Sequence, residues 1–219
     1  MMKMTSVNQL LVFMKYPEEG KVKTRLASVL DVKSALVLYK RMVTCLMKKL
    51  DEPGQPFFTR IFYYPAERGA DMKNWLGSTR AYMPQRGDDL GLRMENAFLD
   101  AFAGSCEKAI IIGCDVPDLS AELIIEAFDR LEGRDAVIGP SMDGGYYLVG
   151  FRREKFAPQI FCGIKWGESD VFQKTMEKFP PGFKIHILPR LRDLDTFEDL
   201  MAFSKKPSGR GLQIGELLR

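Results

Sequence analysis

The sequence predicts an α/β fold, a three-layer α/β/α sandwich in which helices cover both faces of a mostly parallel mixed sheet. Short apolar runs bounded by polar residues alternate with segments of helical periodicity along nearly the whole chain, which is the pattern of βαβ units. At 219 residues, with 46% hydrophobic and 28% charged residues, the chain is long enough for a full core. No repeat or long linker divides it, so we expect a single domain over residues 1–219.

The first half of the chain supplies three strand–helix alternations. Gln9–Lys15 is an apolar run that indicates a buried first strand, and a loop over Tyr16–Arg25 follows it. Asp31 is a suitable N-cap, and apolar residues then recur at helical spacing until Pro53–Gly54. The other elements expected here are strands over Phe57–Tyr64 and Arg80–Met83, helices over Asp71–Leu76 and Leu90–Phe102, and a polar turn at Gln85–Asp89.

The alternation continues through the second half with one exception. The extended segment Tyr146–Phe151 lies too close behind the preceding strand for a helical crossover, so it should break the parallel order. The residues from Lys205 onward include Pro207 and Gly209 and are expected to be loosely attached. The other elements are strands over Lys108–Gly113, Asp135–Gly139 and Lys184–Leu188, and helices over Ser120–Leu131, Ser169–Phe179 and Thr196–Ser204.

Composition and charge exclude several classes of protein. The apolar runs are too short for a membrane span or a signal-peptide core, and the four cysteines form no CxxC pair, which indicates reduced thiols in a cytoplasmic protein without a zinc site. Net charge is +3, but residues 1–49 hold ten Lys and Arg against three acidic residues. This local excess suits a nucleotide-sized anion better than a nucleic acid; a solvated basic helix face is the alternative.

The loops that follow the strands are the expected binding site, because ligands of open α/β sheets bind at the carboxyl ends of the strands. In the first loop, Gly20 permits close approach of the backbone. Lys21, Lys23 and Arg25 place three cations at alternate positions, which suits a pyrophosphate. The loop has neither a Walker A nor a Rossmann glycine pattern, and a solvated basic turn is the alternative interpretation.

Aspartates follow two of the predicted strands. Asp115 comes directly after an apolar strand, where a carboxylate gains nothing from packing, and Asp193 and Asp195 follow the last strand. Carboxylates at strand ends beside a lysine-rich loop indicate a site for Mg²⁺ or Mn²⁺ shared with phosphates. The structural alternatives are helix caps, from Asp118 or Ser120 before one helix and from the capping-box pairs Asp195 with Glu198, or Thr196 with Asp199, before another.

The string DGGYY at residues 143–147 is the most unusual in the chain. Its paired glycines let backbone amides approach a ligand and its tyrosines can stack on a base or sugar, although a hairpin turn is the alternative. Asp143 is a candidate base on the acceptor side. His186, inside an apolar strand, and Cys114, which has no histidine nearby in sequence, are expected to be structural.

Taken together, these strings resemble one known family. Over roughly residues 8–203, the chain is similar to the GT-A-type nucleotide-diphospho-sugar transferases called radical-SAM/selenodomain-associated transferases, in FMKYPEEGKVKTRLA, QRGDDLGLRMENAF, IIIGCDVPDLS, VIGPSMDGGYYLVG, Trp166-Gly167 and DLDTFEDL. Related members include molybdenum cofactor and phospholactate guanylyltransferases. The resemblance implies a first loop that holds the base and phosphates of a nucleotide, a metal-binding Asp115, and a second acidic motif at Asp193 and Asp195.

We therefore expect a transferase that uses a nucleotide-activated donor and a small-molecule acceptor. The first hypothesis is glycosyl transfer from a nucleotide-diphospho-sugar. The alternatives are guanylyltransferase-like nucleotidyl transfer, in which a phosphorylated or carboxylated acceptor attacks the α-phosphate of a nucleotide triphosphate and pyrophosphate is released, and a nucleotide-binding module without catalysis. The candidate catalytic residues are Asp115, Asp143 and Lys23; the candidate nucleotide-binding residues are Lys15, Gly20, Lys21, Lys23, Arg25, Gln85, Asp88, Asp89, Gly144 and Gly145; the candidate ligands of Mg²⁺ or Mn²⁺ are Asp115, Asp193 and Asp195.

Overall fold

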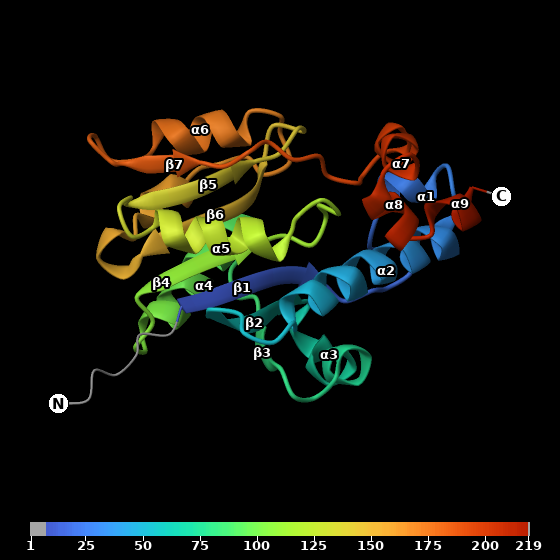
Figure 1. Ribbon diagram of the computed structural model, residues 1–219, viewed down its shortest axis with the longest axis horizontal. Helices are drawn as coiled ribbons and strands as arrows, with labels where there is room; N and C mark the ends of the chain where they lie inside the picture. The colour runs from blue at the N-terminus through green and yellow to red at the C-terminus, as the bar shows by residue number, and fades with distance from the viewer. Residues whose placement is uncertain (1–7, 219) are drawn as a thin grey trace.

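Within residues 8–218, which the computed structural model describes, seven strands form one sheet (Figure 1). The strand order is β3-β2-β1-β4-β6-β5-β7. All neighbouring pairs are parallel except those of β6, which runs antiparallel to β4 and to β5 and so breaks the parallel order as predicted. The strands are β1 (Asn8–Lys15), β2 (Phe57–Tyr64), β3 (Ala81–Pro84), β4 (Lys108–Ile112), β5 (Ala136–Pro140), β6 (Tyr146–Arg152) and β7 (Ile185–Ile187).

Helices cover both faces of this sheet, which confirms the three-layer architecture. The residues of β1 alternate between the faces: Leu10 and Val12 lie in a core cluster with α2, α3 and α5, whereas Leu11 and Phe13 lie in a second cluster with α4 and α6. The helices are α1 (Thr24–Ala27), α2 (Val32–Leu50), α3 (Gly69–Leu76), α4 (Leu90–Phe102), α5 (Ala121–Arg130), α6 (Val171–Glu177), α7 (Phe197–Ser204), α8 (Pro207–Gly211) and α9 (Ile214–Leu217), with 3₁₀ turns at Ala66–Arg68, Arg153–Lys155 and Pro158–Phe161.

The prediction of a loosely attached C-terminal segment is wrong. Helices α7, α8 and α9 gather with α1 and one end of α2 beyond the edge of the sheet (Figure 1). Leu212 and Ile214 are buried there in a third apolar cluster, and Arg41 of α2 pairs with Glu216 at 2.9 Å. Asp118 also accepts hydrogen bonds from Lys206 and Ser208. These short helices are held by tertiary contacts, since helices of four or five residues are not stable alone.

The other predicted elements are confirmed with shifts of one or two residues at their ends. Three of the caps are explained by side chains: Asp31 accepts hydrogen bonds from the backbone of α2, Asp89 from that of α4, and Ser120 from that of α5. In the described part of the chain, no helix combines the length and the apolar character needed to cross a membrane.

Candidate functional site

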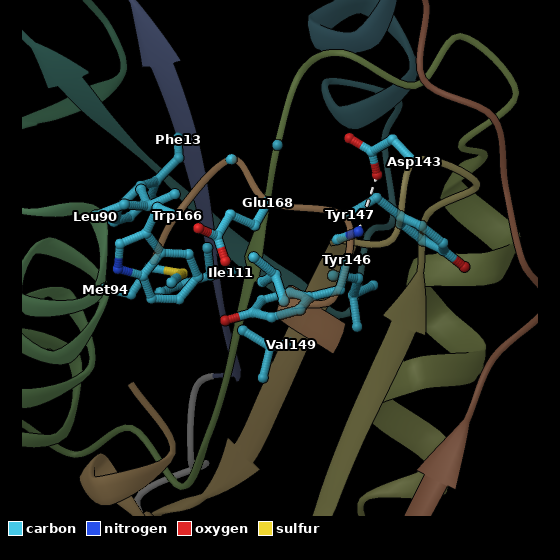
Figure 2. A pocket seen from close by; sticks show the side chains of 15 residues that line it. Phe13, Leu90, Met94, Ile111, Asp143, Tyr146, Tyr147, Val149, Trp166 and Glu168 are labelled. Atoms are coloured by element: carbon cyan, nitrogen blue, oxygen red, sulfur yellow. Dashed lines mark hydrogen bonds between the residues drawn. The ribbon is translucent and has the colours of Figure 1, made fainter. Parts of the chain in front are cut away.

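Two adjoining cavities lie at the carboxyl ends of the parallel strands. The larger is a cleft of about 610 Å³ and the smaller, shown in Figure 2, has a volume of about 190 Å³. The turn between β5 and β6 lies at the same edge, so residues from the loops after β1, β3, β4, β5 and β7 meet in the larger cleft. Of the residues predicted from sequence, the cleft is lined by Lys15, Lys21, Lys23, Arg25, Gln85, Asp115, Asp143, Asp193 and Asp195.

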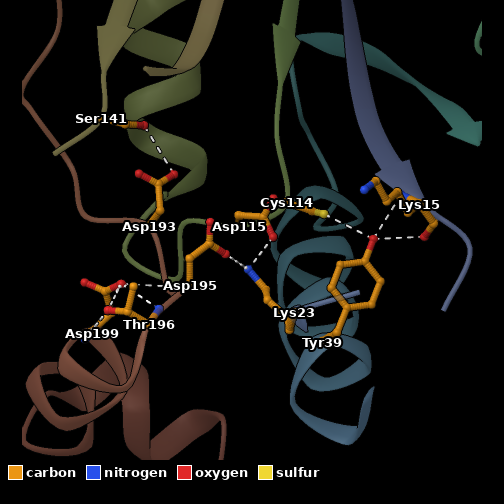
Figure 3. Close-up of polar contacts among 10 residues, drawn as sticks. All are labelled: Lys15, Lys23, Tyr39, Cys114, Asp115, Ser141, Asp193, Asp195, Thr196 and Asp199. Atoms are coloured by element: carbon orange, nitrogen blue, oxygen red, sulfur yellow. Dashed lines mark hydrogen bonds and ion pairs between the residues drawn. The ribbon is translucent and has the colours of Figure 1, made fainter. Parts of the chain in front are cut away.

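Lys23 links two of the predicted aspartates directly (Figure 3). Its Nζ lies 2.5 Å from Oδ1 of Asp115 and 2.7 Å from Oδ1 of Asp195. The lysine side chain is only 2% exposed, whereas the two carboxylates are 45% and 40% exposed. Burial lowers the pKa of Lys23, but the charges and hydrogen bonds of both aspartates outweigh it and raise the pKa above its ordinary value. Lys23 is therefore a buried, charged residue and not an exposed loop cation.

The backbone around Lys23 explains how a lysine reaches this position. Lys23 is the residue before α1 and has φ 49° and ψ 42°, in the left-handed region that a non-glycine residue rarely adopts. Its carbonyl accepts hydrogen bonds from the amides of Leu26 and Ala27, and Leu26 is fully buried below it. The short helix and the two ion pairs together hold this conformation, which costs on the order of 1–3 kcal/mol by itself.

Asp193 lies on the other side of the acidic cluster (Figure 3), and within residues 8–218 it has no cationic partner of its own. Ser141 donates a hydrogen bond to its Oδ1 at 3.2 Å, while its Oδ2 is buried without a partner. Burial first, and then the charges of Asp143, Asp195 and Asp115, raise its pKa to about 7. In the described part of the chain, four carboxylates thus share one edge of the cleft with a single directly bonded ammonium group, so the cluster has room for more positive charge.

The residues present fit a hard divalent cation by their chemistry. Carboxylate oxygens are the ligands that Mg²⁺ and Mn²⁺ prefer, and the unpartnered Oδ2 of Asp193 is available to one. In the arrangement described for residues 8–218, no three His, Cys, Asp or Glu side chains converge closely enough to hold a metal, because the Lys23 ammonium lies between Asp115 and Asp195. A metal bound by all three predicted ligands therefore requires Lys23 to move.

The structure resolves the choice of helix caps that the sequence left open. Thr196 and Asp199 form the capping box of α7: the Thr196 hydroxyl accepts from the Asp199 amide at 3.2 Å, and the Asp199 carboxylate accepts from the Thr196 amide at 2.9 Å. Arg192 also donates to Asp199 at 2.8 Å. Asp195 is therefore not required as a cap, and its side chain points to Lys23 instead.

Several predicted nucleotide-binding residues have other positions or roles. Asp89 is the N-cap of α4, and Gly20 and Asp88 are exposed and do not line the cleft. A Cβ on Gly144 would lie 1.8 Å from the carbonyl oxygen of Ser169. The backbone of Gly144 therefore packs closely against the backbone of Ser169 and not against a ligand site. Gly145 lines the smaller cavity only. The Gln85 amide group donates to two carbonyl oxygens, of Met14 and Phe62, and so joins β1 to β2.

Two lining residues were not selected from the sequence. The Tyr39 hydroxyl bonds both the amide and the carbonyl of Lys15 at 3.0 and 2.9 Å, and the Cys114 thiol donates to it at 3.5 Å. Burial raises the pKa of Cys114 to about 12, so it is a protonated structural thiol, as expected. Arg93 lies over the ring of Tyr64 at 4.1 Å and adds a cation to the cleft. Arg93 lies one helical turn after the Asp89 cap, and this position is the feature of the sequence that could have identified it as a lining residue.

The smaller cavity continues from the cleft past Asp143. Its walls are mostly apolar and come from β1, β4, β6, α4 and the segment 166–171. Figure 2 shows Leu90, Met94 and Trp166 on one side and Asp143 on the other. Trp166 packs on Gly91, where a Cβ would lie 2.9 Å from the indole ring, and meets Tyr146 edge to face with centroids 6.3 Å apart. These contacts define the walls without any ligand.

Comparison with known proteins identifies relatives of this chain. The family described as "Uncharacterized protein conserved in bacteria (DUF2064)" matches residues 54–168. The chain is also similar to a protein of known structure from Desulfovibrio desulfuricans G20 that carries the name "putative nucleotide-diphospho-sugar transferase". The two share 37% identity and a TM-score of 0.88 over 97% of this chain and 96% of the other. No curated protein matches the sequence.

More distant structures share the fold alone. The 4-diphosphocytidyl-2C-methyl-D-erythritol synthase of Anaerococcus prevotii DSM 20548 is 11% identical, with a TM-score of 0.59 over 95% of this chain and 96% of the other. The molybdopterin-guanine dinucleotide biosynthesis protein A of Archaeoglobus fulgidus is 12% identical, with a TM-score of 0.53 over 96% and 97%. The fold is that of the nucleotide-diphospho-sugar transferases, as the resemblance implied.

Proposed function

This chain belongs to the family DUF2064, and from that premise we propose that it is a metal-dependent transferase that moves a glycosyl group from a nucleotide-diphospho-sugar to a small-molecule acceptor. The observation that carries the proposal is the meeting of Lys23 with Asp115 and Asp195 in one cleft that also contains Asp143 and Asp193. The name of the relative that is 37% identical supports the class of donor.

The cations of the cleft suit the phosphates of the donor. Lys15, Lys21 and Arg25 are exposed side chains that line the cleft, and Arg93 reaches it from α4. Exposed cations in a concave site can bind a diphosphate by charge-assisted hydrogen bonds, which are stronger than those between neutral groups. In this proposal Lys21 and Arg25 bind the diphosphate, and Lys23 turns from the carboxylates to the departing group.

The aspartates have two roles in the proposed reaction, one at the departing diphosphate and one at the acceptor. Asp115, Asp193 and Asp195 would hold Mg²⁺ or Mn²⁺, which supplies positive charge to the diphosphate as it departs. The acceptor oxygen forms a bond to the anomeric carbon, and the bond from that carbon to the diphosphate oxygen breaks with its electron pair remaining on the diphosphate. The acceptor proton passes to Asp143, which is exposed and lines both cavities.

Product analysis tests this proposal and separates it from its alternatives. The protein is incubated with a panel of nucleotide sugars and nucleotide triphosphates in Mg²⁺ or Mn²⁺, and the released nucleoside diphosphate and pyrophosphate are measured. We expect nucleoside diphosphate from a nucleotide sugar, by slow hydrolysis where no acceptor is present. Asp115→Asn should lower the rate by about 10²–10³, as removal of an electrostatic group at a developing charge does. Pyrophosphate from a triphosphate would instead indicate nucleotidyl transfer, and binding without turnover a nucleotide-binding module.

A further inference from the structure

We propose that the smaller cavity is the acceptor site and that the acceptor is an uncharged alcohol with an apolar body, carrying neither phosphate nor carboxylate. The inference rests on the proposed function for the meaning of "acceptor", but its evidence is the lining of the cavity. The two cavities share Phe13, Leu90, Gly113, Asp143, Tyr146 and Tyr147 in their linings, so a molecule in the smaller one adjoins the donor cleft.

The charge of the lining excludes an anionic acceptor. Among residues 8–218, no lysine, arginine or histidine lines this cavity, whereas two carboxylates do, those of Asp143 and Glu168. The nearest cation to Glu168 is Lys174 at 3.1 Å, which also pairs with Asp170 at 2.8 Å and does not line the cavity. A phosphate placed here would meet two carboxylates and no cationic partner, and such like-charge contacts strongly disfavour binding.

The apolar part of the lining is the reason for proposing an acceptor with an apolar body. Met94 is 4% exposed and Ile111 is also 4% exposed, and both face the cavity beside Trp166. An apolar cavity of about 150 Å³ is large enough to bind benzene, so about 190 Å³ accommodates one ring with a short substituent. Asp143 lies across the cavity from Trp166 (Figure 2) and also lines the cleft, so in this proposal its carboxylate faces the acceptor hydroxyl.

The charge of the smaller cavity also favours glycosyl transfer over nucleotidyl transfer. Nucleotidyl transfer that releases pyrophosphate would attach the nucleotide to an anionic acceptor in the form considered above, a phosphorylated or carboxylated molecule. The lining of the smaller cavity lacks the cations that such an acceptor needs. An alcohol acceptor is the one that glycosyl transfer uses, because its oxygen forms the new bond to the anomeric carbon as its proton leaves.

Direct binding of matched probes tests the proposal without nucleotide, metal or turnover. Benzyl alcohol and benzyl phosphate share the same apolar body and differ in charge. The chain has two tryptophans, so in the Trp75→Phe variant the fluorescence of Trp166 reports binding. We expect benzyl alcohol to change this fluorescence and to bind with an affinity at least tenfold higher than that of benzyl phosphate. Glu168→Gln removes one carboxylate from the lining and should reduce this ratio of affinities.

A filled cavity supplies the matched control. Val171 lines the cavity, and Val171→Phe should abolish the response to benzyl alcohol while circular dichroism shows a folded protein. If that variant fails to fold, the affinities of the two probes for the Glu168→Gln protein still test the proposal. Equal or tighter binding of benzyl phosphate by the Trp75→Phe protein, or no response to benzyl alcohol, would overturn the inference. If the product assay shows no turnover of any donor, only the proposed function is overturned, because binding of the probes does not depend on donor turnover.

Discussion

Lys23 and Asp195 are 172 positions apart in the sequence, yet the ammonium nitrogen of one lies 2.7 Å from a carboxylate oxygen of the other. The two ends of this pair differ in their exposure to water: the lysine side chain is 2% exposed and that of Asp195 is 40% exposed. The same asymmetry applies to Asp115, at 45%. The lysine consequently depends on its partners far more than they depend on it.

The first prediction follows from this asymmetry. Neutralising both carboxylates in Asp115→Asn/Asp195→Asn leaves a buried ammonium without a counter-charge and should lower the free energy of unfolding by about 3–5 kcal/mol. Lys23→Met leaves two carboxylates that water can still solvate, and should cost about 1 kcal/mol. Urea unfolding in the absence of metal measures both. If Lys23→Met proves the more destabilising change, Lys23 is not the dependent partner.

The second prediction concerns nucleotide binding by the first loop. Arg25 is exposed, so Arg25→Ala should weaken binding of a nucleoside diphosphate with Mg²⁺ by about 1.5–3 kcal/mol and leave the melting temperature nearly unchanged. Titration calorimetry measures the affinity. Lys40→Ala, an exposed cation of α2 that does not line the cleft, is the matched control. Lys23→Ala should also weaken binding, but unlike Arg25→Ala it should lower stability. Unchanged affinity in both loop variants would show that the first loop does not bind the phosphates of the nucleotide.

The third prediction tests the packing of the C-terminal helices. A Cβ on Gly209 would lie 1.8 Å from the carbonyl oxygen of Phe203, a backbone atom that cannot turn aside. Gly209→Ala should therefore lower the free energy of unfolding by about 2 kcal/mol or more. Gly211→Ala, where a Cβ meets nothing within 4 Å, should be neutral or stabilising by up to about 1 kcal/mol. Equal melting temperatures for the two variants would show that α8 is not packed as described.

The fourth prediction is a pH dependence at Asp135. The backbone amide of Lys184 donates to its carboxylate at 2.9 Å, and this hydrogen bond, more than the nearby Lys155 and Arg152, lowers the pKa of Asp135 below its usual value. A lowered folded-state pKa means that the ionised group stabilises the fold at neutral pH and that this contribution is lost as pH falls through the folded pKa.

Asp135→Asn should accordingly cost about 1–2 kcal/mol at pH 7, where the wild-type carboxylate is ionised. The difference from wild type should shrink below about pH 3.9, the ordinary value for aspartate, as the wild-type side chain becomes protonated. Denaturant unfolding at pH 7 and pH 3 measures it. A difference that is constant with pH would mean that the charge of Asp135 contributes nothing.

The strands could be predicted from sequence because parallel strands covered on both faces are continuous apolar runs, and Gln9–Lys15 is one. The reversed direction of β6 was predictable from the shortness of its connection to β5. The C-terminal helices were not, because the segment after Lys205 has no helical periodicity and depends on contacts with α2 that lie far away in sequence.

The members of the site were largely predictable, but their arrangement was not. Asp115 and Asp193 were selected because they follow strands without a structural role of their own, and Asp195 because it belongs to the second acidic motif of the family that the chain resembles. The structure brings all three to one cleft. Nothing in the local sequence indicates that Lys23 is buried, since the partners that neutralise it are 92 and 172 residues away. The sequence singled out DGGYY and Trp166-Gly167, which contribute lining residues to the smaller cavity, but it did not predict the cavity itself, because the walls come from segments that pack together only in the fold.

The ion pairs of Lys23 have a consequence for the chain as it is being translated. Ribosomal synthesis delivers Lys23 early, Asp115 after 92 further residues and Asp195 after 172. Domains generally fold as units while the chain emerges from its N-terminal end. A nascent chain that already contains β1 and β4 would still lack the second carboxylate of Lys23 and the whole acidic loop after β7. The growing polypeptide would therefore acquire both carboxylate partners of Lys23 only after Asp195 has emerged from the ribosome.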